Sequence, residues 1–409
     1  MKKPALRLKK FNGDWNECVL KEKASFSKGF GYSKNDLTDT GHPIVLYGRL
    51  YTKYQTVISD IDTFVNVKEG SVLSQGNEVV IPASGECAED IARASVIADK
   101  NIILGGDLNI VKPDKSLDSV FLALSISYGS AHSKLVSQSQ GATIAHLHNA
   151  EIQNVVVSYP SDKAEQKAIG SFFTELDSLI EGKRVKLDKL KKLKLAYLGK
   201  MFPKKGSRVP EVRFKGFSGD WEEKKLSDYL TICPIVNSDN RYNAKDVLSV
   251  SGEFGVVNQI EFQGRSFAGA SLLKYRVSET GTVIYTKSPL KANPYGIIKA
   301  NKGPTGIVSV LYAVYVPNDN ADADFVQVYF DDMYRLNSYL RTLVNKGAKN
   351  TLLISDEEAL NGYVVFPSRP EQRKIAAFFN HLDNLINLQQ QELDKLANIK
   401  SACLSKMFA

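Results

Sequence analysis

Two stretches in the first half of the chain place guanidinium, ammonium and amide side chains among tyrosines, a combination that can hydrogen-bond the edges of nucleic-acid bases. One is YGRLYTKYQ at residues 47–55, and the other is the polar loop SQSQG at residues 137–141. Each stretch taken alone also fits an ordinary surface loop or hairpin. The candidate base-contacting residues of this half are Tyr47, Arg49, Tyr51, Lys53, Gln55, Gln138 and Gln140.

The second half of the chain contains comparable stretches. They are QGR at residues 263–265, YTKS at 285–288 and KGAKN at 346–350, and the Asn293-Pro294-Tyr295 turn could also face a duplex. The candidate base-contacting residues of this half are Gln263, Arg265, Tyr285, Lys287, Ser288, Asn293, Lys346, Lys349 and Asn350.

Residues that could carry catalysis form only incomplete motifs. Asn293-Pro294-Tyr295 is similar to the Asn-Pro-Pro-aromatic motif of adenine methyltransferases, but the second proline and a preceding glycine-rich cofactor turn are absent. No G-x-x-x-x-G-K-[ST] motif is present to cradle phosphates, and Pro113-Asp114 lacks the acidic-x-Lys of a magnesium-dependent nuclease. His146 and His148 have no carboxylate or thiol at metal-ligand spacing. The sequence therefore predicts neither a catalytic residue nor a metal site.

The formal net charge of +8 is unevenly placed along the 409 residues. Residues 1–160 and 206–367 are each neutral, and most of the excess lies in residues 161–205. Any DNA-binding face on the neutral segments requires that acidic residues gather on other sides. The four cysteines show no paired spacing, and no apolar run is long enough for a membrane span or a secretory signal, so we expect a cytoplasmic protein without membrane contact.

The chain is a tandem duplication. FNGDW at residues 11–15 returns as FSGDW at 217–221, and the same offset of 206 relates residues 164–202 to 370–408, of which 19 of 39 positions are identical. Residues 30–135 and 235–340 show no convincing alignment. The chain therefore consists of a repeated part, the frame, which includes 11–15 and 164–202 with their copies, and of two unlike inserts, 30–135 and 235–340.

The two repeated 39-residue stretches predict long helices, because their apolar residues recur at three- and four-residue spacing. A narrow apolar stripe on a helix of about 60 Å favours another long helix as its partner, and the duplicate is the obvious one, in antiparallel orientation. The alternative is that each helix packs only on its own domain. The residues expected to pair the helices or to dock partner subunits are Phe172, Phe173, Leu176, Leu179, Phe378, Phe379, Leu382 and Leu385.

The inserts mix strand-like stretches, such as residues 76–84 and 282–287, with helical ones, such as 119–127 and 325–344. We therefore predict an α+β fold with two globular domains related by pseudo-two-fold symmetry and separated by a pair of long antiparallel coiled-coil helices. The predicted boundaries are residues 1–160 and 206–367 for the globular domains, and 161–205 and 368–409 for the helices.

These features resemble the DNA-specificity subunit of a type I restriction–modification enzyme, and the resemblance covers the whole chain. It rests on motifs that all occur twice in the same order: the frame starts at 7–22 and 213–228, the Glu-Gln pairs at 165–166 and 371–372, LDxLI at 176–180 and 382–386, and the Lys-Met-Phe endings. The first helix begins SDKAEQ where the second has SRPEQ, which weakens Asp162 as an N-cap.

The resemblance implies a protein without chemistry of its own. In such enzymes each insert is a target-recognition domain that reads one half of a split, asymmetric DNA site, while the frame helices set the spacing and dock two methylation subunits. Two restriction subunits complete the complex, and S-adenosylmethionine, ATP and Mg²⁺ belong to the partners rather than to this chain. Two alternatives stay open: a single-chain DNA methyltransferase or nuclease, and a coiled-coil adaptor that binds other proteins.

Overall fold

The computed structural model describes residues 4–139, 144–269, 271–290, 293–346 and 352–408. The chain forms two compact units, and neither unit coincides with one sequence repeat. Unit 1 consists of Met1–Val185 with Gln390–Ala409, and unit 2 consists of Lys186–Gln389. Each unit therefore combines the globular part of one repeat with the end of the other repeat's helix.

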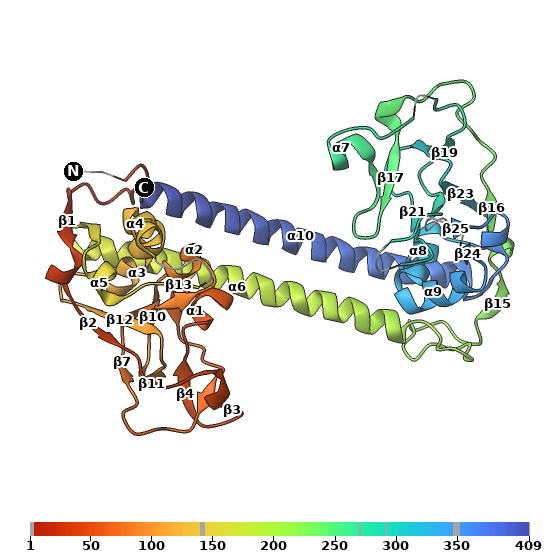
Figure 1. Ribbon diagram of the computed structural model, residues 1–409. Helices are drawn as coiled ribbons and strands as arrows, with labels where there is room; N and C mark the ends of the chain where they lie inside the picture. The colour runs from red at the N-terminus through yellow and green to blue at the C-terminus, as the bar shows by residue number, and fades with distance from the viewer. Residues whose placement is uncertain (1–3, 140–143, 270, 291–292, 347–351, 409) are drawn as a thin grey trace. The chain divides into compact units, whose positions relative to one another are not determined.

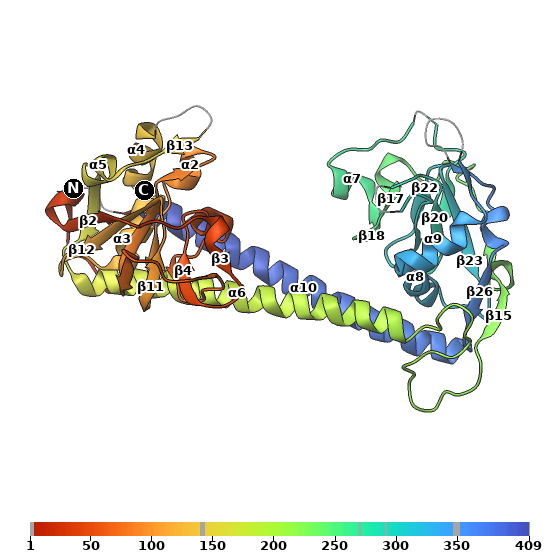
Figure 2. The same ribbon diagram turned by 60° about the horizontal axis from the view of Figure 1, so that its bottom comes forward.

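Unit 1 contains two five-stranded sheets, ordered β2-β12-β8-β10-β5 and β3-β6-β4-β11-β7, and the two-stranded pairs β1-β14 and β13-β9. Its strands are β1 (Trp15–Val19), β2 (Ala24–Lys28), β3 (Leu37–Thr38), β4 (His42–Val45), β5 (Val57–Ile58), β6 (Phe64–Val65), β7 (Leu73–Gln75), β8 (Glu78–Pro82), β9 (Ser84–Gly85), β10 (Ser95–Ile97), β11 (Lys100–Leu104), β12 (Leu108–Pro113), β13 (Ala145–His146) and β14 (Val156–Pro160). Its short helices are α1 (Arg49–Thr52), α2 (Ala88–Ile91), α3 (Ser119–Tyr128), α4 (Ser130–Gln138) and α5 (Asn149–Gln153). Helix α3 packs on β8 and β10. Figure 2 shows α3 among the strands of the globular part of unit 1.

Unit 2 contains a four-stranded antiparallel sheet, ordered β16-β23-β20-β21, and several strand pairs. Its strands are β15 (Glu222–Lys225), β16 (Leu230–Ile232), β17 (Leu248–Ser251), β18 (Gly255–Asn258), β19 (Arg276–Ser278), β20 (Val283–Thr286), β21 (Ile298–Ala300), β22 (Gly306–Val308), β23 (Tyr312–Pro317), β24 (Asn345–Lys346), β25 (Leu352–Leu353) and β26 (Tyr363–Phe366). Its short helices are α7 (Gln259–Gln263), α8 (Ala323–Asp331) and α9 (Met333–Arg341), and α8 packs on β20 and β21. The predicted α+β class is confirmed in both units.

The two repeated stretches form the long helices α6 (Lys163–Lys200) and α10 (Arg369–Met407), as predicted (Figure 1). Asp162 does cap α6, because its Oδ1 accepts from the backbone N–H of Ala164 at 2.8 Å. Each helix contributes to both units. In unit 1 Asp177 contacts Lys400 while the earlier Phe173 contacts the later Phe408, and in unit 2 Lys194 contacts Asp383 while the later Tyr197 contacts the earlier Phe378. The helices are therefore antiparallel within each unit.

Ion pairs related by the offset of 206 hold the helices together. In unit 1, Lys400 of α10 pairs with Asp177 of α6, and in unit 2 Lys194 of α6 pairs with Asp383 of α10 at 2.7 Å. Burial lowers the pKa of Lys194, but the negative charges of Asp331 and Asp383 outweigh burial and the pKa is raised overall. The duplicated LDxLI motif thus supplies one carboxylate to each copy of the helix contact.

The Met and Phe of each Lys-Met-Phe ending are buried in the core formed by the globular part of the other repeat. Phe202, from the first repeat, contacts Trp221, Phe325 and Phe379 in unit 2, with ring centroids 5.8–6.1 Å apart. Phe408, from the second repeat, contacts Phe121 at 5.6 Å and Phe173 at 6.1 Å in unit 1. Each core is therefore completed by the other repeat.

The repeated Phe-x-Gly-Asp-Trp and Glu-Gln motifs meet in one buried cluster in each unit. Arg213 donates two hydrogen bonds of 2.7 Å to Glu371 at the start of α10 and one of 2.6 Å to the carbonyl of Gly219. Arg7, Glu165 and Gly13 make the same set of contacts in unit 1. The frame motifs thus have a structural role: in each repeat they hold the first residues of the repeat against the start of its long helix, α6 or α10.

The glutamine of each Glu-Gln pair holds the loop that leads into a neighbouring helix. Gln372 donates to the carbonyls of Asn320 and Pro367 at 2.9 Å and accepts from the backbone N–H of Asp322 at 3.0 Å. Asp322 in turn caps α8 through the N–H of Phe325. Gln166 makes the corresponding bonds in unit 1.

Replacing Arg213 by lysine should lower the free energy of unfolding by about 1–3 kcal/mol, because lysine cannot donate in parallel to both oxygens of the buried Glu371 carboxylate. Urea unfolding of the variant measures the change. Arg208→Lys is the matched control, since Arg208 pairs with Glu223 on the exposed surface and should leave stability nearly unchanged. Equal losses in the two variants would contradict the structural role of the Arg213 cluster.

Candidate nucleic-acid interface

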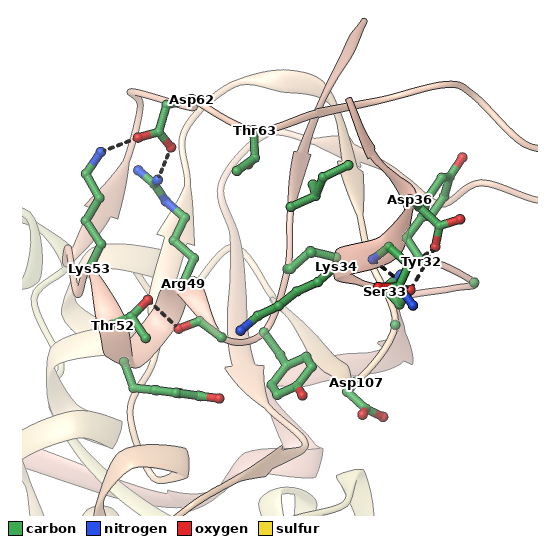
Figure 3. A pocket seen from close by; sticks show the side chains of 18 of the residues that line it. Tyr32, Ser33, Lys34, Asp36, Arg49, Thr52, Lys53, Asp62, Thr63 and Asp107 are labelled. Carbon is green, nitrogen blue, oxygen red and sulfur yellow. Dashed lines mark hydrogen bonds and ion pairs between the residues drawn. The ribbon is translucent and has the colours of Figure 1, made fainter. Parts of the chain in front are cut away.

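A cavity of about 910 Å³ in unit 1 collects most of the candidate residues of the 47–55 stretch. Tyr47, Arg49, Tyr51 and Lys53, on α1 or close to its ends, line the cavity together with the turn at residues 31–37. Figure 3 shows Arg49 and Lys53 on the wall formed by α1, and Lys34 and Asp36 on the opposite wall formed by the turn. The rings of Tyr47 and Tyr51 lie 6.3 Å apart. The structure therefore brings these four predicted residues into one site.

The two cations of the α1 wall are bound within the protein. Arg49 donates to Asp62 and Gln55 at 2.8 Å and to the carbonyl of Asp60 at 2.5 Å, and only 8% of its side chain is exposed. Lys53 donates to the other oxygen of Asp62 at 2.8 Å, and this hydrogen bond lowers the pKa of Asp62. Arg49 and Lys53 thus shape the cavity wall while they share one carboxylate, that of Asp62.

The opposite wall is a short 3₁₀ turn, η2 (Lys34–Asp36), held by its own side chains. Ser33 accepts from the N–H of Asn35 at 3.3 Å, and Asp36 accepts from the N–H of Ser33 at 2.8 Å. A hydrogen bond from Lys68 lowers the pKa of Asp36 to about 2, so this carboxylate stays charged at neutral pH. This turn was not predicted from the sequence, although the Ser33-x-x-Asp36 spacing fits a capping box.

The remaining glutamines of the first half lie away from this cavity. Gln55 accepts from Arg49 and lines a second cavity, and Gln138 ends α4 with its Oε1 buried. Gln140 lies outside the described residues.

His146 and His148 stack with ring centroids 6.4 Å apart, and the described residues contain no group of three or more potential metal ligands.

The candidate residues of the second half are spread over unit 2. Gln263, the last residue of α7, and Arg265 are exposed, and the Arg265 guanidinium lies 4.5 Å from the centroid of the Phe267 ring. Lys287 shares Asp356 with Arg276, each at 2.8 Å, which repeats the arrangement of Lys53 and Arg49 around Asp62. In each unit, therefore, one candidate lysine forms an ion pair with an aspartate that also pairs with an arginine.

Tyr285 was wrongly placed among the DNA-contacting candidates. It lies in β20 with no exposed surface, and its hydroxyl donates to the carbonyl of Tyr295 at 2.8 Å. Burial raises its pKa, so Tyr285 is a neutral core residue. Ser288 and Asn293 are half-buried, the structure describes only the backbone of Lys346, in β24, and Lys349 and Asn350 lie outside the described residues.

The residues predicted to pair the helices or to dock partner subunits show the same pattern of burial in α6 and in α10. Phe173 and Phe379 are fully buried, Phe172 and Phe378 are half-buried, and Leu176 and Leu382 are buried. Leu179 and Leu385, by contrast, keep 47% and 37% of their surface exposed. These two leucines therefore remain partly open to solvent in the described chain. No helix among the described residues has an apolar stretch long enough to span a bilayer.

Comparisons with known proteins point in one direction. Residues 12–192 match the family described as the type I restriction modification DNA specificity domain. The specificity subunit of the type I restriction enzyme MjaVIII from Methanocaldococcus jannaschii is 22% identical over 360 residues, which make up 84% of this chain and 80% of that protein. The S subunit of the type I restriction–modification system from M. genitalium shares the fold, with a TM-score of 0.64 at 16% identity over 100% of this chain and 99% of that one.

The family match lies on the first repeat, whose frame motifs recur in the second at a constant offset. Residues 12–192 therefore match the type I restriction modification DNA specificity domain family, and the predicted resemblance of the chain to type I specificity subunits is confirmed.

Proposed function

We propose that this chain directs a type I restriction–modification complex to a two-part DNA sequence, with unit 1 reading one half-site and unit 2 the other. The observation that carries the proposal is the duplication: one frame of the DNA specificity family occurs twice, with two unlike inserts. Two different readers in one chain favour an asymmetric target whose half-sites are separated by a fixed gap.

The helix pair is the part of the chain that sets this gap and docks two methylation subunits. Leu179, Leu195, Leu385 and Leu388 support the docking role, because each is a large apolar side chain of α6 or α10 that remains exposed. Two restriction subunits join through the methylation subunits. The complex acts on DNA in the cytoplasm.

The chain itself is a non-catalytic subunit in this proposal. S-adenosylmethionine would bind to the methylation subunits, and ATP and Mg²⁺ to the restriction and methylation partners. The incomplete Asn293-Pro294-Tyr295 motif supports this assignment, since the second proline is absent.

Co-expression of the chain with the methylation subunit encoded beside it, followed by single-molecule sequencing of the host genome, tests the proposal. We expect one asymmetric motif of methylated adenines, composed of two half-sites with a constant gap. The purified chain alone, incubated with DNA, a methyl donor and Mg²⁺, should transfer no methyl group and cut no strand. A stable complex without any methylated motif would favour the protein-interaction adaptor instead.

A further inference from the structure

The polar side chains around the cavity of unit 1 are of two kinds: those that already have a hydrogen-bond or ion-pair partner within the protein, and those that have none among the described residues. Arg49 and Lys53 are bound to Asp62, and Asp36 is paired with Lys68. A side chain that already has its partners has to break those contacts before it can bind a base edge. Breaking them costs free energy, most of all for Arg49, whose side chain is only 8% exposed. The residues best able to contact a ligand are therefore the unpaired ones.

Lys34 and Asn35, on the η2 turn, are these unpaired residues. Both are exposed, and within the described ranges neither the ammonium group of Lys34 nor the side-chain amide of Asn35 has a hydrogen-bond or ion-pair partner. Figure 3 shows the Lys34 side chain extending from the turn across the cavity toward α1. Both side chains are thus free to bind a group that enters the cavity.

The backbone beneath these two residues is fixed. Tyr32, directly before the turn, is buried, and its hydroxyl lies 2.5 Å from Ser71 Oγ and accepts from the N–H of Lys68 at 2.6 Å. Ser33 and Asp36 close the turn at its two ends. A fixed backbone leaves only the two side chains to be ordered on binding, which lowers the total entropy cost and favours specific contacts.

We propose that Lys34 and Asn35 are specificity-determining residues that read base edges of double-stranded DNA in the half-site bound by unit 1. This inference rests on the proposed function and names the readers within it. An asparagine amide pairs with the N6 and N7 atoms of adenine, and a lysine ammonium donates to O6 and N7 of guanine. Arg49 is then a positioning residue that holds the α1 wall through Asp62, rather than a reader.

Unit 2 contains a similar capped turn, which follows β16 as η2 follows β2 in unit 1. The turn is followed by Val247, which pairs in parallel with Ile307 of β22, as β4 after η2 pairs in parallel with β11. There Asn243 accepts from the N–H of Lys245 at 2.9 Å, and Asp246 accepts from the N–H of Asn243 at 2.8 Å. This turn, η4 (Ala244–Asp246), presents Ala244 and an exposed Lys245 where η2 presents Lys34 and Asn35. Unlike side chains on similar turns are what two unlike half-sites require.

The test uses the full chain co-expressed with its methylation subunit and maps the methylated motif for the wild type and for Lys34→Ala and Asn35→Ala. Each variant should relax a base position in one half-site, lowering discrimination there on the order of tenfold to a hundredfold, and leave the other half-site unchanged. Lys245→Ala should relax the other half-site. Lys134→Ala, at an exposed position on α4, is the matched control and should leave the motif intact.

The possible results separate this inference from the function it rests on. A wild-type motif that is unchanged in both Lys34→Ala and Asn35→Ala would overturn the inference while the proposed function stands. A uniform loss of methylation at all sequences would indicate phosphate contact and would also overturn the reading role, provided that the melting temperature of the variant matches the wild type. A wild-type complex without a motif would remove the proposed function itself.

Discussion

Replacing Phe202 by alanine should destabilise unit 2 by about 3–5 kcal/mol, although Phe202 belongs to the first sequence repeat. Its ring is 1% exposed and contacts Trp221, Phe325 and Phe379. The guanidinium of Arg335 lies 4.4 Å from the same ring centroid. Removing the ring leaves a cavity in the centre of this cluster, and the Arg335 guanidinium keeps only Tyr329 of its two aromatic partners.

Native-state hydrogen exchange, read separately for residues 206–367 and 1–160, measures where the stability is lost. Phe202→Ala should speed exchange in residues 206–367 and leave 1–160 protected, whereas Phe408→Ala should do the reverse. Leu195→Ala is the control on the same helix, because 68% of that side chain is exposed and its loss should change neither segment. If Phe202→Ala instead loosened residues 1–160, the exchange of helix ends between the repeats would be wrong.

The long helices could be predicted because their signal is local and repeated. Three- and four-residue apolar spacing over 39 residues, together with the duplicate at a constant offset, left few alternatives, and α6 and α10 begin and end within two residues of the predicted stretches. Strands such as β8 and β20 were also recognisable from their β-branched and aromatic composition.

Breaks inside apolar stretches were harder to see. The stretch at 325–344 is two helices, α8 and α9, because the Asp332 side chain accepts from the N–H of Arg335 and starts a new helix. Residues 306–317, which form one β-branched and aromatic stretch in the sequence, are likewise two strands, β22 and β23, in different sheets, and the N–H of Tyr312 donates to the carbonyl of Ser309 at 3.0 Å in the turn between them. In both cases the break is caused by a few hydrogen bonds, which hydrophobic spacing does not encode.

The site was predictable by segment rather than by residue. Sequence composition located the 47–55 stretch, but it could not show that Arg49 and Lys53 are bound to Asp62, which lies nine residues beyond Lys53. Tyr285 was misjudged because a tyrosine beside a lysine fits both an exposed loop and a buried strand. Whether a polar side chain is free or engaged depends on tertiary contacts.

A half-length chain of residues 1–206 should form a dimer, because it lacks the part of α10 that completes unit 1. Without Leu404, Met407 and Phe408, the apolar surface around Phe121 and Phe173 would be open to water. The fragment carries equivalent residues of its own at the end of α6, namely Leu198, Met201 and Phe202. Two copies can therefore exchange these helix ends in a closed, two-fold arrangement.

Sedimentation equilibrium of the folded fragment measures this association, and Phe202→Ala within the fragment is the decisive comparison. In the full chain Phe202 stabilises unit 2, but in the fragment it has to fill the position of Phe408 against a second copy, so its loss should shift the fragment from dimer to monomer. Tyr197 would then lie where the full chain has the half-buried Cys403, which packs against the core of unit 1, and this larger side chain should make the dimer weaker than the native contact. A fragment that is folded and monomeric at every concentration would show that helix pairing does not drive association. A dimer, in contrast, would carry two identical readers, and with the methylation subunit it should methylate a palindromic site.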